Sequence, residues 1–367
     1  MSRQSELAEL SRVYDSSALS NRNVVINGGM TVAQRSSGTV TVSDGSNEGY
    51  ATVDRFELRF NATAGGAIEM SQSTDTPDGF ANSVKLKCST ADSAHTGTQS
   101  IYLGQRIEAQ NLQQLGYGSS GAKQITVSWY MKTVNYTDPI SLALETKDGT
   151  AEYFVKSYTP TTSWARYTCT VPASTSATIA NDSGNGMEVK FVIAGTSGGT
   201  HAASSDSTAW STTRADYRNN IGNFVASTSN EIYITGVQLE VGDTATPFEP
   251  RSFGQELALC QRYTFVHETG VAYGWSALSG YCNTTSNALS FYQFPVKMRA
   301  APALTVSGDL QILDGFTSYS VTSKSLGLGT VFNARVDVGA SGLTAGRHIA
   351  TRNNNDADCK VIFDAEL

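Results

Sequence analysis

Aromatic side chains are the residues of this 367-residue sequence with the clearest chemical use. The apolar C–H face of a sugar ring packs flat on an indole or phenol ring, while neighbouring polar groups bond the sugar hydroxyls. Such stacking requires an aromatic ring that is not buried in the core of the protein. The candidates for glycan stacking are Trp164, Trp210, Tyr217, Tyr273 and Trp275.

Each candidate also has a structural interpretation. Trp210 and Tyr217 lie in the long polar segment 201–220, where the tryptophan either pins the connection onto the protein body or offers a stacking surface. Trp164 stands at the start of an expected strand and fits both roles. Tyr273 and Trp275 belong to the densest aromatic region of the chain, where packing between identical subunits is the first interpretation and ligand contact the second.

Residues for covalent catalysis form no recognisable pattern. The four histidines lie in polar turns or at strand edges, and the run GYGSSG at 116–121 is not a nucleophile elbow of the G-x-S-x-G type. Two carboxylate pairs, Glu145 with Asp148 and Glu231 with Glu240, have the residue types for cleaving a polysaccharide. Pairs of this kind arise by chance in any chain of this size, so we expect a binding protein and not an enzyme.

The cysteines and the charge exclude several classes of protein. The five cysteines are widely separated without a C-x-x-C spacing, which favours buried free thiols over a disulfide framework or a zinc site. The net charge of −7 is spread along the chain, so nucleic acid and anionic lipid are not expected partners. No apolar run approaches the ~20 residues of a membrane span, and no secretory signal opens the sequence. We expect no cofactor, no membrane insertion and folding in a cytoplasm.

The elements that would position these residues are short strands. Residues 84–88, 125–131, 140–144 and 187–193 alternate between apolar and polar side chains, and runs rich in Gly, Ser and Asn separate them. In the second run, Trp129 shares its face with other apolar side chains and is expected in the core. The pattern predicts an all-β protein with an antiparallel β-sandwich, or jelly roll, over residues 23–250.

The stretch from 232 to 264 marks the end of this sandwich. Apolar side chains alternate from Ile232 to Val241 with a one-residue break at Gly236, which predicts a β-bulge. Pro247 and Pro250 then prevent both strand pairing and a helix. Residues 251–264 predict a linking helix with Ser252 as N-cap and Gln255 completing a capping box. The apolar face expected for this helix comprises Phe253, Leu257 and Cys260.

The two ends of the chain are expected to make contacts with other chains. Residues 265–367 again alternate with period two and predict a smaller C-terminal β-sandwich, whose modest core favours oligomerisation. The last run, 359–367, suggests that the chain ends inside a sheet. Residues 1–22 predict an attachment helix and linker, with Leu7, Leu10 and Val13 at helical spacing. A helix this short is unstable alone, so it is expected to dock on another chain.

Several longer runs carry a resemblance to a known family. They are SALSNRNVVINGGMTVAQRSSG (17–38), YATVDRFELRF (50–60, expected as a strand), residues 234–263, FPVKMRAAPALTV (294–306) and the terminal FDAEL. Together they resemble a tail-fibre or related virion structural protein of bacteriophages, particularly marine phages. The sandwich is similar to the jelly roll of carbohydrate-binding modules, in which a strand like YITGVQLE closes the domain.

The resemblance implies a homo-oligomer, most often a trimer, on the virion tail or particle surface, assembled in the host cytoplasm. It also implies contacts with other virion proteins through the N-terminal segment, and multivalent binding of a host-surface glycan. A capsid-surface decoration protein and a polysaccharide depolymerase are the alternatives. Related jelly rolls hold a structural calcium with an Asp in the last strand, whereas Thr235 and Gly236 occupy that region here, which leaves the metal without its usual ligand.

Overall fold

The computed structural model describes residues 21–62, 64–95, 99–195, 202–203, 205–214, 218–219, 221–277, 279–315 and 317–367. The protein is all-β, as predicted. It divides into unit 1, Met1–Glu256 with Leu367, and unit 2, Leu257–Glu366. The expected attachment helix with Leu7, Leu10 and Val13 lies outside the described residues, as does Tyr217. No helix in the described part of the chain is long and apolar enough to cross a membrane.

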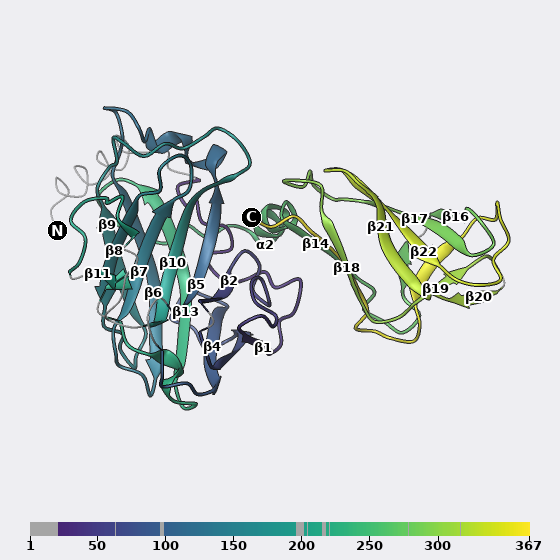
Figure 1. Cartoon of the computed structure of the whole chain (residues 1–367), viewed down its shortest axis with the longest axis horizontal. Coiled ribbons are helices and arrows are strands. Elements are labelled where there is room, and N and C mark those ends of the chain that lie inside the picture. Colours follow the sequence, from purple (N-terminus) through teal and green to yellow (C-terminus); the bar gives the residue numbers. More distant parts are fainter. Residues whose placement is uncertain are drawn as a thin grey trace. The chain divides into compact units, whose positions relative to one another are not determined.

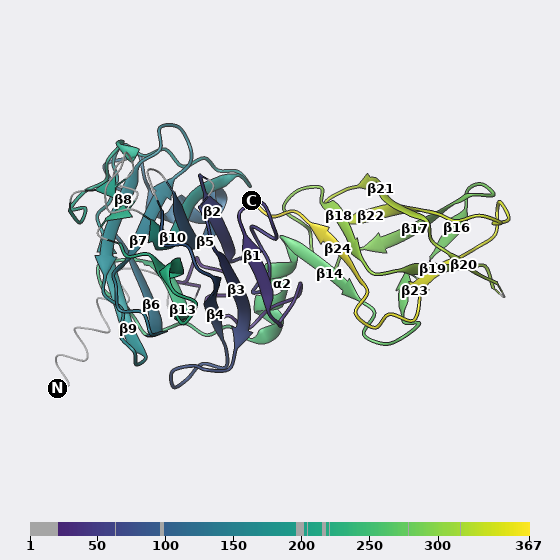
Figure 2. The same ribbon diagram turned by 60° about the horizontal axis from the view of Figure 1, so that its bottom comes forward.

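The described residues of unit 1 form two large antiparallel sheets that lie face to face (Figures 1 and 2). The six-stranded sheet has the order β1 (Val40–Ser43), β3 (Ala67–Ser73), β4 (Ser83–Thr90), β13 (Glu231–Val241), β6 (Ile125–Val134) and β9 (Ala165–Val171). The five-stranded sheet has the order β2 (Glu57–Asn61), β5 (Ser100–Glu108), β10 (Asn185–Gly195), β7 (Ile140–Thr146) and β8 (Tyr153–Tyr158). The short elements are η1 (Ala109–Leu115), η3 (Phe224–Ala226) and the parallel pair β11 (Ala202–Ala203) and β12 (Arg218–Asn219).

The core of unit 1 lies between these sheets, where the alternating apolar residues meet. Trp129 on β6 is fully buried, and its ring lies 5.3 Å from that of Phe191 on β10, so this aromatic contact joins the two layers. The expected strand over 50–60 is wrong in its first part, because β2 begins only at Glu57. Before it, Arg55 adopts a positive φ, and the Asp54 carboxylate accepts hydrogen bonds from Gln34, so this segment forms a turn.

Strand β13 carries the bulge that the sequence predicts. Its pairing with β6 shifts between Thr235 and Gln238, and Gly236 has a φ of +63°. An added Cβ at Gly236 would lie 2.7 Å from the Phe80 ring, so glycine is required for space as well as for conformation. The extra residue returns Val237 to the core, and the apolar alternation continues to the end of the strand.

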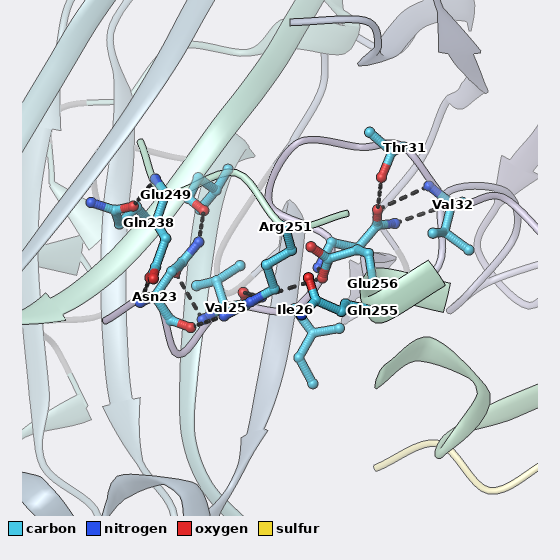
Figure 3. Close-up of polar contacts among 12 residues, drawn as sticks. Asn23, Val25, Ile26, Thr31, Val32, Gln238, Glu249, Arg251, Gln255 and Glu256 are labelled. Carbon is cyan, nitrogen blue, oxygen red and sulfur yellow. Dashed lines mark hydrogen bonds and ion pairs between the residues drawn. The ribbon is translucent and has the colours of Figure 1, made fainter. Parts of the chain in front are cut away.

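A segment that we call the strap, residues 21–32, closes unit 1 along β13 (Figure 3). The side chain of Asn23 donates to the Val237 carbonyl at 3.0 Å and accepts from the Leu239 amide at 3.1 Å. The Asn23 amide donates to Oε2 of Glu249 at 3.0 Å, and the Glu249 amide donates to Oε1 of Gln238 at 2.8 Å. The strap is therefore fixed both to the central strand and to the proline-bracketed loop that follows it.

Arg251 and Glu256 hold the next part of the strap. The Arg251 guanidinium donates to the carbonyls of Asn23 and Val25, and its Nη1 lies 3.3 Å from Oε1 of Glu256. That carboxylate also accepts the Asn27 amide at 2.5 Å. The runs INGGM and FEPRSFGQE, two parts of the family resemblance, thus contact each other directly (Figure 3).

Helix α2 (Phe253–Gln261) begins as the sequence predicts. The Ser252 amide donates to Oε1 of Gln255 at 3.1 Å, and the Gln255 amide donates to Oγ of Ser252 at 3.4 Å, which completes the capping box. The expected apolar face is only partly correct, because Cys260 is fully buried while Phe253 is 60% exposed. Phe253 occupies the first helical position, beside the exposed cap.

The described residues of unit 2 form three antiparallel sheets. The three-stranded sheet has the order β14 (Thr264–Glu268), β24 (Lys360–Asp364) and β18 (Ala303–Ser307). The β15 sheet has the order β15 (Trp275–Ala277), β23 (Ala350–Asn353), β19 (Leu310–Leu313) and β20 (Ser318–Ser320). The β16 sheet has the order β16 (Gly280–Cys282), β17 (Asn287–Gln293), β22 (Asn333–Gly339) and β21 (Ser323–Gly329).

The core of unit 2 is centred on Phe363 of β24, whose ring contacts those of Phe265, Tyr292 and Phe294. Strand β24 ends at Asp364, so the last three residues extend beyond the sheet in which the chain was expected to end. All five cysteines of the protein are buried free thiols, as predicted.

Candidate functional site

The outer face of the β15 sheet brings an exposed aromatic residue next to polar side chains. Backbone pairing aligns Trp275, Arg352, Gln311 and Ser320 in one row across the four strands. Side chains at paired positions of antiparallel strands project from the same face of a sheet. Trp275 is 49% exposed, and the nearby Tyr273 is 46% exposed. We call Tyr273 and this row the aromatic row.

Hydrogen bonds fix the polar members of the aromatic row. Arg352 Nε donates to Gln311 Oε1 at 3.3 Å, and its Nη2 donates to Ser318 Oγ at 3.2 Å. The Arg352 guanidinium carbon lies 4.7 Å from the centre of the Tyr273 ring, a cation–π contact. Gln311 in turn donates to Oδ1 of Asn354 at 2.8 Å. The row therefore offers an aromatic plane beside oriented amide and guanidinium groups, which is the chemistry that a saccharide requires.

A β-bulge and a histidine orient Trp275. The pairing of β15 with β23 shifts between Trp275 and Ala277, so Ser276 and Ala277 are both buried while Trp275 points outward. His267 Nε2 donates to the Trp275 carbonyl at 3.0 Å and fixes the backbone at this position.

Asn353 holds the turn that carries Tyr273. The side chain of Asn353 is fully buried, and its Oδ1 accepts the Tyr273 amide at 2.6 Å and the Asp356 amide at 3.2 Å. Its Nδ2 donates to Thr269 Oγ1 at 2.7 Å and to the Val271 carbonyl at 2.6 Å. Tyr273 itself has a φ of +58°, a strained conformation that these bonds compensate.

We expect Asn353→Ala to lower the free energy of unfolding of unit 2 by about 2–3 kcal/mol, because buried backbone groups lose their partners. Thermal unfolding of the full chain, followed by circular dichroism, measures this change. Asn353→Asp retains the acceptor and should also destabilise, since it removes two donors and buries a charge. A melting profile identical to that of the wild type would show that the turn does not depend on Asn353.

Trp210, another sequence candidate, packs against unit 1. Its ring centre lies 5.9 Å from that of Tyr117 and 6.0 Å from that of Phe154, and its Nε1 donates to the Pro172 carbonyl at 2.7 Å. Trp210 therefore holds its connection against the protein body, which is the structural interpretation given in the sequence analysis. Trp210 is half-buried, and its contact with a glycan stays a prediction.

Trp164 lies at the outer face of the six-stranded sheet, immediately before β9, in a cluster of paired charges. Its Nε1 donates to Asp75 Oδ1 at 3.1 Å, and Lys132 Nζ lies 5.7 Å from the ring centre. Lys132 also pairs with Asp75 and lies 4.8 Å from the centre of the Tyr233 ring. Slight burial opposes ionisation of Asp75, but the bonds from Lys132 and Trp164 hold its pKa below the usual value. Both edge and face of this indole already have protein partners, so Trp164 offers less free surface than Trp275.

Carboxylates gather on the outer face of the five-stranded sheet, a grouping that the sequence analysis missed. Arg106 Nε lies 3.0 Å from Glu57 Oε1 and 3.3 Å from Glu188 Oε1, and Lys190 pairs with both Glu188 and Glu145. Burial raises the pKa of Glu57. Burial acts in the same direction on Glu188, but the surrounding lysines and Arg106 hold its pKa below the usual value.

Divergent pKa values in neighbouring carboxyl groups are a feature of acid–base pairs. However, the side chains of Glu57 and Glu188 are only 1% and 6% exposed, so a polysaccharide has no surface to contact there. Of the pairs named from the sequence, Glu231 and Glu240 lie near opposite ends of β13. In the other pair, Glu145 with Asp148, the Asp148 carboxylate accepts a hydrogen bond from the Ala180 amide.

Thr235 and Gly236, which occupy the calcium position suggested by the resemblance, have other roles in the structure. Thr235 donates to the Asn82 carbonyl at 2.7 Å, and Gly236 forms the bulge. Within the described ranges, no group of three or more His, Cys, Asp or Glu residues is arranged to hold a metal ion.

Comparison with known proteins gives weak structural matches. No protein-family model matches the chain, and no curated protein matches it. A family 4 carbohydrate-binding module has 15% identity and a TM-score of 0.30, with 59% of this chain and 98% of that chain covered. A family 11 module from Clostridium thermocellum, in complex with a β-1,3-1,4-mixed-linked tetrasaccharide, has 13% identity and a TM-score of 0.29, with 57% and 99% covered.

The enzymatically active domain of tailspike protein 4 from bacteriophage CBA120 has 12% identity and a TM-score of 0.29. The match covers 55% of this chain and 21% of that chain, so the matched part spans only about a fifth of the tailspike chain's length. At these identities and TM-scores, none of the matches assigns a function or a ligand to this chain.

Proposed function

We propose that this chain is a structural component of a bacteriophage particle that recognises host-surface glycans without catalysing a reaction. The observation that carries the glycan part is the aromatic row, where the half-exposed Trp275 lies beside Arg352 and Gln311. The support for a virion role is the sequence resemblance to phage fibre proteins, which includes the strap and the FEPRSFGQE run. The proposed position is a tail fibre or its tip.

Binding of the purified full chain to an array of surface oligosaccharides tests the glycan part. Retention of at least one saccharide class supports it, whereas an absence of binding to every saccharide would contradict it. Antibody labelling of intact particles tests the position, because staining of the head would favour the capsid-decoration alternative. Release of reducing ends from host polysaccharide would favour a depolymerase.

The proposed oligomer rests on the outer face of the β16 sheet. Tyr281, Phe291 and Leu328, from three of its strands, are 39%, 44% and 59% exposed. Arg335, paired with Phe291 and Leu328 in the sheet, forms a two-bond ion pair with Asp337. Around a threefold axis, this face of one copy meets the same face of its neighbours, and a cation beside an anion lets neighbouring copies present opposite charges to each other, so the occupant that we propose is another copy of this chain.

We expect mass photometry of the purified chain to show an oligomer, with a trimer as the main species. Phe291→Asp should shift the distribution towards monomers, because it places a charge in the apolar part of the interface. Trp275→Asp is the matched control on the β15 sheet and should leave the oligomer intact. A wild-type monomer at micromolar concentration would contradict the proposal.

A further inference from the structure

Arg352 differs from Arg347 and Lys360, two other cations of unit 2, in having no acidic partner among the described residues. Its two side-chain hydrogen bonds go to the neutral acceptors Gln311 and Ser318. Among the described residues, no carboxylate lies within ion-pair distance of its guanidinium. Elsewhere in unit 2, Arg347 pairs with Asp314 at 2.8 Å, and Lys360 lies 3.3 Å from Glu268.

The surroundings of Arg352 keep this positive charge in place. Tyr273 lies under the guanidinium, and the amide of Gln311 and the hydroxyl of Ser318 fix its edge. Within the row that backbone pairing defines, Arg352 is the only ionisable side chain, since its neighbours are Trp275, Gln311 and Ser320. A cation held without a counter-ion beside an exposed indole has the features needed to bind a sugar that carries an anionic oxygen group.

We propose that the ligand class of the aromatic row is an acidic saccharide, a uronate or a sulfated sugar, whose ring stacks on Trp275 and whose anionic group binds Arg352. This inference rests on the proposed glycan recognition and adds the charge of the ligand to it. Carboxylate and sulfate share the required chemistry, with oxygen atoms that accept hydrogen bonds from guanidinium N–H groups. A neutral sugar would leave the charge of Arg352 without a partner.

The test uses the full chain and an array of matched saccharides, in which each neutral backbone is printed beside its uronate and its sulfated form. Oligomers of β-1,4-mannose and β-1,4-mannuronate are one such pair, because they differ only at the carbon-6 substituent. We expect the acidic member of at least one pair to bind about tenfold or more tightly than the neutral one. This preference should weaken when sodium chloride is raised from about 50 to about 500 mM, because salt screens exposed charges.

Variants separate this inference from the proposed function. Arg352→Gln retains a polar side chain without the charge and should reduce the acid preference to about twofold or less, while stacking on Trp275 still gives measurable binding. Lys324→Gln removes one positive charge from β21, which belongs to the β16 sheet, and should leave the preference unchanged. Uronate hits that exceed sulfate hits identify a carboxylate ligand, and the reverse identifies a sulfate.

Two outcomes would overturn the inference. If neutral saccharides bind as well as acidic ones, or if Arg352→Gln retains the full preference, glycan recognition stands and the acidic ligand class is wrong. If no saccharide of any charge binds the wild-type chain, the proposed function fails together with the inference.

Discussion

Replacing Trp275 by alanine is expected to lower the affinity for glycans about 30-fold, since a central aromatic anchor of a binding surface contributes about 2 kcal/mol or more. The indole is half-exposed, and the backbone pairing of β15 with β23 does not depend on it. The substitution should therefore remove the stacking surface and leave the fold intact. Isothermal titration of the full chain with its best array hit measures the effect.

The matched control for this experiment is Phe291→Ala. Phe291 is 44% exposed, similar to Trp275, but it lies on the outer face of the β16 sheet. Its loss should leave the affinity per site unchanged, although it weakens association of the copies. Wild-type affinity in Trp275→Ala, combined with lost affinity in Phe291→Ala, would move the binding site to the β16 sheet.

Gly28→Ala is expected to destabilise unit 1 by about 3 kcal/mol, a cost typical of severe overpacking. An added Cβ at Gly28 would lie 2.0 Å from the carbonyl oxygen of Val237, and that oxygen belongs to the central strand β13. A backbone atom in the middle of a sheet cannot move aside without disturbing the pairing of its strand. The hydrogen bond from the Val237 amide to the Gly28 carbonyl, 3.0 Å long, would be disturbed as well. Urea unfolding followed by circular dichroism gives the free energy.

The neighbouring Gly29 provides the control. A Cβ added there would meet the Phe248 ring at 3.6 Å, an ordinary contact distance, so Gly29→Ala should change the stability by less than about 1 kcal/mol. Equal effects of the two substitutions would show that loss of glycine flexibility, and not the contact with β13, governs the stability of the strap.

The local features of this fold were predictable because neighbours in sequence determine them. The bulge at Gly236 follows from a one-residue break in alternation, and the capping box at Ser252 follows from a spacing of three residues. The strand expected over 50–60 was wrong in its first part because the contacts that make a turn there come from Gln34, which periodicity does not reveal.

The candidate site was only half predictable for a similar reason. Tyr273 and Trp275 are conspicuous in the sequence, whereas Arg352 and Gln311 become relevant only through the pairing of β15 with β23 and of β23 with β19. The alternation at 350–353 does place Arg352 on the face opposite Thr351 and Asn353, a weak signal. Register between strands so distant in sequence depends on topology, which a single sequence does not specify.

The strap has a consequence for the order of events during protein synthesis. Asn23 and Asn27 bond to Glu249 and Glu256, residues 226 and 229 positions later in the chain. Asn23 and Asn27 leave the ribosome early, but they can form these bonds only after most of unit 1 has been synthesised. Contacts of such long range make folding slow. A nascent chain interrupted before β13 therefore lacks Val237, Glu249 and Glu256, three of the residues that hold the strap in the finished protein.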